Sequence, residues 1–217
     1  MSGLRYTLLS DGTSDRALLF AIRWALQQRD VRIDKEEIAD VSGLMRRHSP
    51  LKDRLAATAR LYGETDLLFV HRDAEKEPSK VRVREVVAAA ETCNVGVPVV
   101  PVVPVRMTEA WLLIDEQAIR RASENPNGRM ELKLPAPAKL EGLPDAKEVL
   151  FDLLRTASGR SGHRGLTSKD LGKMRHRVAE LTSDWAPLRK LPSFRAFEAA
   201  LDGEPALERF RLAAAGR

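Results

Sequence analysis

The 217-residue chain carries a formal net charge of +5, with 43% hydrophobic and 31% charged residues, which excludes disordered and fibrous proteins. Cys93 is its single cysteine, so a disulfide framework and a thiolate metal site are excluded, and a reducing, cytoplasmic compartment is expected. The most apolar stretch, Val95 to Val105, is too short for a bilayer span, and the N-terminus shows no secretion signal, so we expect no membrane attachment.

The N-terminal part of the chain begins with the pattern of a strand, a loop and a helix. A β-prone run from Tyr6 to Leu9 precedes the turn-forming sequence Asp11-Gly12-Thr13-Ser14-Asp15, and apolar residues then recur at helical spacing from Ala17 to Ala25. A second strand is expected at Val31-Arg32-Ile33 or at Ile38-Ala39-Asp40-Val41.

The same alternation continues to residue 122. Helical periodicity from Leu51 to Leu61 precedes the clearest strand, Asp66 to His71, which is apolar enough to be buried on both faces. A helix from about Ser79 to Thr92 and a strand from Val97 to Val103 follow, and an amphipathic helix is predicted from Glu109 to Ala122. The prolines of the last strand favour an edge position, or pairing of only Val99-Val100 and Val102-Val103.

Strands that alternate with helices predict an α/β fold, with a mostly parallel, Rossmann-like sheet flanked by helices. We assign residues 1–123 to this core and residues 124–217 to a helical, basic appendage that packs on it. The appendage should contain helices near Ala146 to Leu154, Ser168 to Leu181 and Ser193 to Leu201.

Positive charge is concentrated in the appendage. Between Arg155 and Arg195 there are ten Lys and Arg against three Asp and Glu, so the rest of the chain is slightly acidic. A basic segment of this kind suits a polyanion such as DNA or RNA, although a solvated helical face would have the same composition.

Acidic residues follow three of the predicted elements. Asp11, the pair Asp73 and Glu75, and Glu109 all fall where a strand ends, and the carboxyl ends of parallel strands meet at one edge of a sheet. Carboxylates are the ligands that Mg²⁺ prefers, so the pattern predicts a site for Mg²⁺ or Mn²⁺. The alternative for each acid taken alone is a helix cap, formed by Asp11 on the first helix and by Asp73 or Glu75 on a later one.

Asp11-Gly12-Thr13-Ser14-Asp15 and Asp73-Ala74-Glu75 resemble the two acidic motifs of the Toprim domain found in topoisomerases, primases and OLD-family nucleases. In that family the motifs usually read Glu-Gly-x-x-Asp and Asp-x-Asp, so this chain exchanges one acid in each. The segment from Glu109 to Asp115, Glu-Ala-Trp-Leu-Leu-Ile-Asp, and Pro192-Ser193-Phe194-Arg195-Ala196-Phe197 are similar to later motifs of small bacterial Toprim-like proteins.

The resemblance implies roles for individual residues. Asp11 would be a metal ligand or general base, and Asp73, Glu75 and Glu109 would bind the metal. Asp15 would orient the first loop or cap its helix. Lys173 would stabilise charge on the phosphate, and Lys169, Arg175 and Arg177 are the alternatives for this role. His71, inside a buried strand, is interpreted as a core residue.

These residues favour a metal-dependent nuclease of Toprim type that hydrolyses phosphodiesters of DNA or RNA. The resemblance also implies an AAA-type or ABC-type ATPase partner in a bacterial antiphage defence system. The alternative is a non-catalytic Toprim-like subunit that binds an ATPase partner or nucleic acid, because the exchanged acids at Asp11 and Glu75 alter the metal site. The oligomeric state stays open.

Overall fold

The computed structural model of the protein describes residues 2–45, 49–74, 77–105, 107–161 and 165–212. Its centre is a parallel sheet of four strands in the order β2-β1-β3-β4. The strands are β1 (Leu4–Leu9), β2 (Ile33–Ile38), β3 (Leu67–His71) and β4 (Val99–Val102). The predicted α/β fold with a parallel sheet flanked by helices is therefore confirmed.

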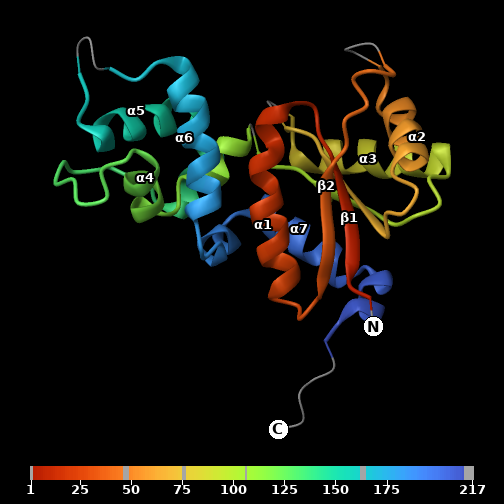
Figure 1. Ribbon diagram of the computed structural model, residues 1–217. Coiled ribbons are helices and arrows are strands. Elements are labelled where there is room, and N and C mark those ends of the chain that lie inside the picture. Colours follow the sequence, from red (N-terminus) through yellow and green to blue (C-terminus); the bar gives the residue numbers. More distant parts are fainter. Residues whose placement is uncertain (1, 46–48, 75–76, 106, 162–164, 213–217) are drawn as a thin grey trace, which may run out of the picture.

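The central strands are buried because both of their faces are covered. Alternate side chains of a strand point to opposite faces, so Phe69 joins the large hydrophobic cluster on one side while Leu68 and Val70 join a smaller cluster on the other. Helices α1 (Leu18–Gln27) and α7 (Pro192–Asp202) belong to the large cluster (Figure 1). The helices of the opposite face are α2 (Leu51–Leu61) and α3 (Ser79–Cys93).

The two edge strands differ in composition from the centre. β4 contains Pro101, which has no N–H to donate, and of the two alternatives left open by its prolines the structure shows the edge position. β2 carries charged residues from Asp34 to Glu37, which discourage pairing with another chain. It lies between the two segments that the sequence suggested, because register with β1 rather than apolar content selects Ile33–Ile38.

The C-terminal helices form a second group beside the sheet (Figure 1). It consists of α4 (Glu116–Ala122), α5 (Ala146–Ser158) and α6 (Ser168–Leu181), which contact one another. α6 also lies beside α1 and contacts two 3-10 helices, η1 (Thr13–Ala17) and η2 (Thr108–Leu112), which follow β1 and β4 in the chain. This contact brings the basic appendage against the end of the sheet.

The prediction of one continuous helix from Glu109 to Ala122 is wrong. The chain forms η2, leaves helical geometry at Leu113, and starts α4 at Glu116. Asp115 caps α4 because its side chain accepts a hydrogen bond from the backbone N–H of Ala118 at 2.9 Å. The break turns η2 towards the sheet edge, so that Glu109 is not part of a regular helix.

Within the described segments, no helix has the length and apolar character needed to cross a bilayer.

Candidate functional site

The carboxyl ends of β1 and β3 and the start of η2 bring four acidic side chains to one edge of the sheet. These are Asp11, Asp15, Asp73 and Glu109, and we call this region the acidic edge. Glu75, the fifth acid of interest, lies outside the described residues. The convergence predicted from the strand ends is present for Asp73 and Glu109, because the negative charge of Glu109 acts on the pKa of Asp73.

The imidazole of His71 lies at the centre of the acidic edge. β3 ends at His71, and its Nε2 lies 3.2 Å from Oδ1 of Asp73. On the other side, Nδ1 lies 3.4 Å from Oδ2 of Asp15, an ion-pair distance without the alignment of a hydrogen bond. The hydroxyl of Thr108 closes the group at 3.4 Å from Nε2. The interpretation of His71 as a core residue captures its burial but not this role.

Charge determines how His71 and Asp73 ionise. Burial acts to lower the pKa of His71, but the carboxylates of Asp15 and Asp73 outweigh burial and raise it to about 9. The imidazole is therefore protonated at neutral pH. Burial raises the pKa of Asp73, and the charges of Asp15 and Glu109 raise it further while His71 opposes them. Burial and the two neighbouring acids thus favour the protonated form of Asp73, whereas His71 favours its ionised form.

Asp15 has the structural role that the sequence suggested and a second one. Its Oδ2 accepts a hydrogen bond from the backbone N–H of Gly12 at 3.0 Å, which orients the loop after β1. The same buried carboxylate faces His71, and it accepts from the hydroxyl of Thr108 at 3.5 Å. Asp15 therefore joins the loop to the centre of the acidic edge.

Asp11 is at the rim of the acidic edge. It is half-exposed and forms ion pairs with Arg54 of α2 and with Arg72, whose Nη1 lies 3.3 Å from Oδ2 of Asp11. Arg72 also pairs with Glu85 of α3 at 3.4 Å. Asp11 does not cap η1, whose preceding residue is Gly12, and Asp73 is well before Pro78, which precedes α3. The capping alternatives for Asp11 and Asp73 are thus wrong.

The cation that reaches the acidic edge from α6 is Arg175. Its Nη1 donates to Oε1 of Glu109 at 2.6 Å, and only 18% of the Arg175 side chain and 8% of the Glu109 side chain are exposed. Lys173 is exposed, and so are Lys169 and Arg177. Of the four basic residues considered from the sequence, the structure brings Arg175 to the acids and leaves Lys173 in solvent.

A divalent ion fits the donor chemistry of the acidic edge, since the acids supply the oxygen ligands that Mg²⁺ and Mn²⁺ prefer. Burial first, and then the charges of Asp15 and Glu109, raise the pKa of Asp73, and a bound cation would favour its ionised form. However, among the described residues no three His, Cys, Asp or Glu side chains gather around one point that could hold a metal ion. An ion would have to displace a protein cation from at least one carboxylate.

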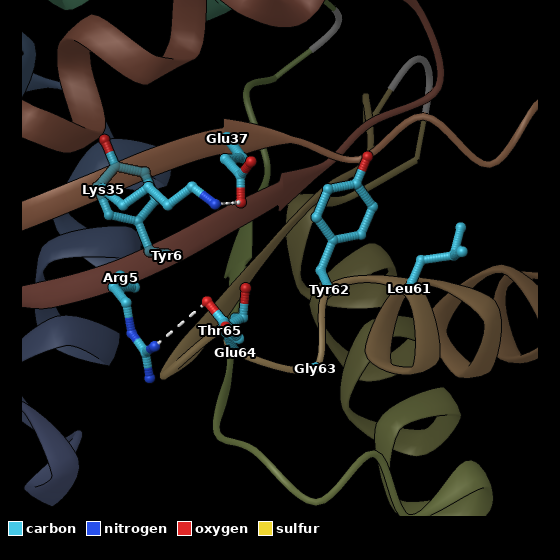
Figure 2. Close-up of a pocket in the computed structure, with 9 residues that line it drawn as sticks. All are labelled: Arg5, Tyr6, Lys35, Glu37, Leu61, Tyr62, Gly63, Glu64 and Thr65. Carbon is cyan, nitrogen blue, oxygen red and sulfur yellow. Dashed lines mark ion pairs between the residues drawn. The ribbon is translucent and has the colours of Figure 1, made fainter.

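A hollow of about 230 Å³ lies near the amino ends of β1 and β3, away from the acidic edge (Figure 2). Its charged residues neutralise each other in two pairs, Arg5 with Glu64 at 3.6 Å and Lys35 with Glu37 at 3.0 Å. This hollow has no surplus charge, so we do not assign it a catalytic role.

Of the residues that sequence reasoning missed, His71 had the clearest signal. It is two residues before Asp73, and side chains two apart share a face of an extended chain. Arg72 and Thr108 are direct neighbours of predicted site residues. Arg54 had no signal, since its pairing with Asp11 depends on how α2 packs on the sheet.

The chain matches no protein-family model, no curated protein and no solved structure in the comparisons. The resemblance to Toprim domains therefore stays a prediction that rests on the motifs of the chain itself.

Proposed function

We propose that the protein is a Toprim-like phosphodiesterase that uses Mg²⁺ or Mn²⁺ to hydrolyse DNA or RNA at the acidic edge. The observation that carries the proposal is that Asp73 lies beside Asp15 and Glu109, where burial first, and then the charges of these two acids, raise its pKa. Neighbouring acids with a perturbed pKa at the carboxyl edge of a parallel sheet are typical of a functional site.

Asp73 and Asp11 would hold the metal, together with Glu75 by the Toprim resemblance. When bound, the ion would supply a water of lowered pKa and neutralise charge on the phosphate. The protonated His71 fixes the orientation of Asp73 from one side and is itself held by Asp15. Arg175 is the proposed cation for the phosphate in place of Lys173, because α6 carries it over the sheet edge.

The experiment compares cleavage of plasmid, linear DNA and RNA by wild type and Asp73→Asn with Mg²⁺ or Mn²⁺. Losing an outer partner of a metal ligand lowers activity by up to about 100-fold. Because Asp73 is proposed to be a ligand itself, we expect Asp73→Asn to lower the cleavage rate at least about 100-fold. Asp152→Asn is the matched control, since Asp152 is exposed on α5 and, among the described residues, pairs with Arg155 of the same helix. Its rate should equal that of wild type.

One observation favours the alternative of a non-catalytic subunit that binds an ATPase partner or nucleic acid. Protein cations already neutralise the acids, namely Arg54 and Arg72 at Asp11, His71 at Asp73, and Arg175 at Glu109. Calorimetric titration with Mn²⁺ separates the two functions. A nuclease should bind Mn²⁺ in wild type and lose binding in Asp73→Asn, whereas absence of both binding and cleavage would contradict the proposed catalysis.

A further inference from the structure

A hollow of about 490 Å³ opens beside the acidic edge, at the outer edge of β2. Its walls are the outward side of η1 and α1, the last residues of β2, Tyr62 after α2, and His176 of α6. Its volume falls in the range of pockets that bind small molecules. Unlike the smaller hollow of Figure 2, it borders η1 and α6, which contribute Asp15 and Arg175 to the acidic edge.

Consecutive residues connect this hollow to the acidic edge on two elements. On η1, the side chain of Asp15 faces His71 while the next residue, Arg16, lines the hollow. On α6, Arg175 binds Glu109 while the next residue, His176, lines the hollow. Neighbouring residues of a helix point in directions about 100° apart, so the hollow and the acidic edge lie on adjoining sides of η1 and α6.

Aromatic rings line the hollow, and the guanidinium of Arg23 lies over one side of the Phe20 ring, 5.2 Å from its centroid. The rings of Phe20 and His176 lie 5.6 Å apart at an interplanar angle of 61°, and both side chains are partly exposed. Burial and the neighbouring charges of Arg16 and Arg175 lower the pKa of His176, so its imidazole is neutral at neutral pH. A neutral imidazole can both donate and accept a hydrogen bond beside a stacked ring.

The hollow also has a surplus cation. Its two acids are already paired, Glu36 with Arg23 and Glu37 with Lys35. Arg16 is exposed and has no acidic partner within the described part of the chain. Aromatic faces next to an unpaired guanidinium match the two parts of a nucleotide, a base and a phosphate.

We propose that this hollow binds one nucleotide of a single-stranded polynucleotide, with the base against Phe20 and His176 and its phosphate at Arg16. The neighbouring phosphate then lies at the acidic edge, so this inference rests on the proposed function and specifies its substrate as unpaired DNA or RNA. A base enters the hollow only when it is unstacked and unpaired, which excludes an intact duplex.

The test measures fluorescence anisotropy of labelled single strands of about 12 nucleotides, within the usual site sizes, and of the matching duplex, all in EDTA. Phe20→Leu removes the ring but keeps an apolar side chain, and should weaken single-strand binding about 10-fold without changing its salt dependence. Arg16→Gln should reduce the slope of log K against log salt by about 0.7, the value for one phosphate contact on a single strand.

The control is Arg84→Gln, an exposed arginine on α3, which covers the opposite face of the sheet. It makes the same charge change as Arg16→Gln and should leave affinity and slope at wild-type values. Thermal melts check folding, and Arg16 is exposed, so the Arg16 variant carries the test if Phe20→Leu unfolds.

Three results would overturn the inference: no binding of single strands by wild type, equal affinity for the duplex, or wild-type binding by both variants. Because binding is measured without metal, it is independent of catalysis. Binding that depends on Phe20 and Arg16 without any cleavage would overturn the proposed nuclease but support the nucleotide site. Cleavage that neither variant changes would support the proposed nuclease and overturn the nucleotide site.

Discussion

His71 holds the acidic edge together at the scale of single residues. A protonated imidazole between Asp15 and Asp73 compensates carboxylates that would otherwise repel each other in a poorly solvated place. Thr108 adds a hydroxyl at hydrogen-bond distance from the same ring. The group is therefore organised before any ion or substrate binds.

We expect the stability of the metal-free protein to fall as pH rises, and to do so because of His71. Its folded pKa of about 9 exceeds the ordinary value of 6.5, so its contribution is complete below pH 6.5 and disappears as pH rises through 9. A shift of this size corresponds to about 3 kcal/mol. The measurement is urea unfolding of wild type and His71→Gln in EDTA from pH 6 to 10.

Taking the difference in unfolding free energy between the two proteins cancels the contributions of the other titratable groups, because both proteins contain them. It should be largest near pH 6 and small at pH 10. A difference that is constant across this range would show that His71 is not protonated in the folded state.

The sequence predicted that Asp73 and Glu109 would meet, but not that Asp15 would face His71 beside them. Asp73 and Glu109 follow strand ends, and the geometry of a parallel sheet then brings them to one edge. The protonation of His71 depends on burial and on two carboxylates, Asp73 at 3.2 Å and Asp15 at 3.4 Å, and the contact with Asp15 arises only when η1 packs against the end of β3. Local sequence does not determine such packing.

At the scale of elements, α6 shows what a helix pattern can and cannot predict. Its bounds, Ser168–Leu181, are those expected from periodicity. Leu171, Met174 and Val178 are its buried face, and at 100° per residue Arg175 is next to that face while Lys173 is opposite it. The choice of Arg175 was therefore accessible from the sequence, but its partner Glu109 was not, because it depends on the break between η2 and α4.

We expect Arg175→Ala to lower the free energy of unfolding by about 3 kcal/mol, because it leaves the buried carboxylate of Glu109 without its cation. Lys173→Ala on the same helix should change it by less than about 0.5 kcal/mol, since Lys173 is exposed. Chemical unfolding of both variants at pH 7 measures the two values. Equal effects would contradict the assignment of Arg175 to the inward face of α6.

At the scale of the whole molecule, α7 completes the hydrophobic core on one face of the sheet. Phe194 of α7 packs edge to face on Trp111 of η2 with ring centroids 5.1 Å apart, and Phe197 contacts Phe69 of β3 at 6.2 Å. One hydrophobic cluster thus contains residues from both sides of position 123. The division at residue 123 stays a prediction about organisation along the chain, whereas the packing is continuous across it.

We therefore expect residues 1–123 and 124–217 to unfold together, and Phe194→Ala to destabilise both. Removing this fully buried ring should cost about 3–5 kcal/mol, because it leaves a cavity against Trp111. Thermal unfolding followed by tryptophan fluorescence and by far-ultraviolet circular dichroism should give one coincident transition, shifted to lower temperature in the variant. Leu44→Ala, at a side chain that is 54% exposed, is the control and should cost less than about 0.5 kcal/mol. Two separate transitions, with only one displaced by Phe194→Ala, would show that the appendage folds independently of the sheet.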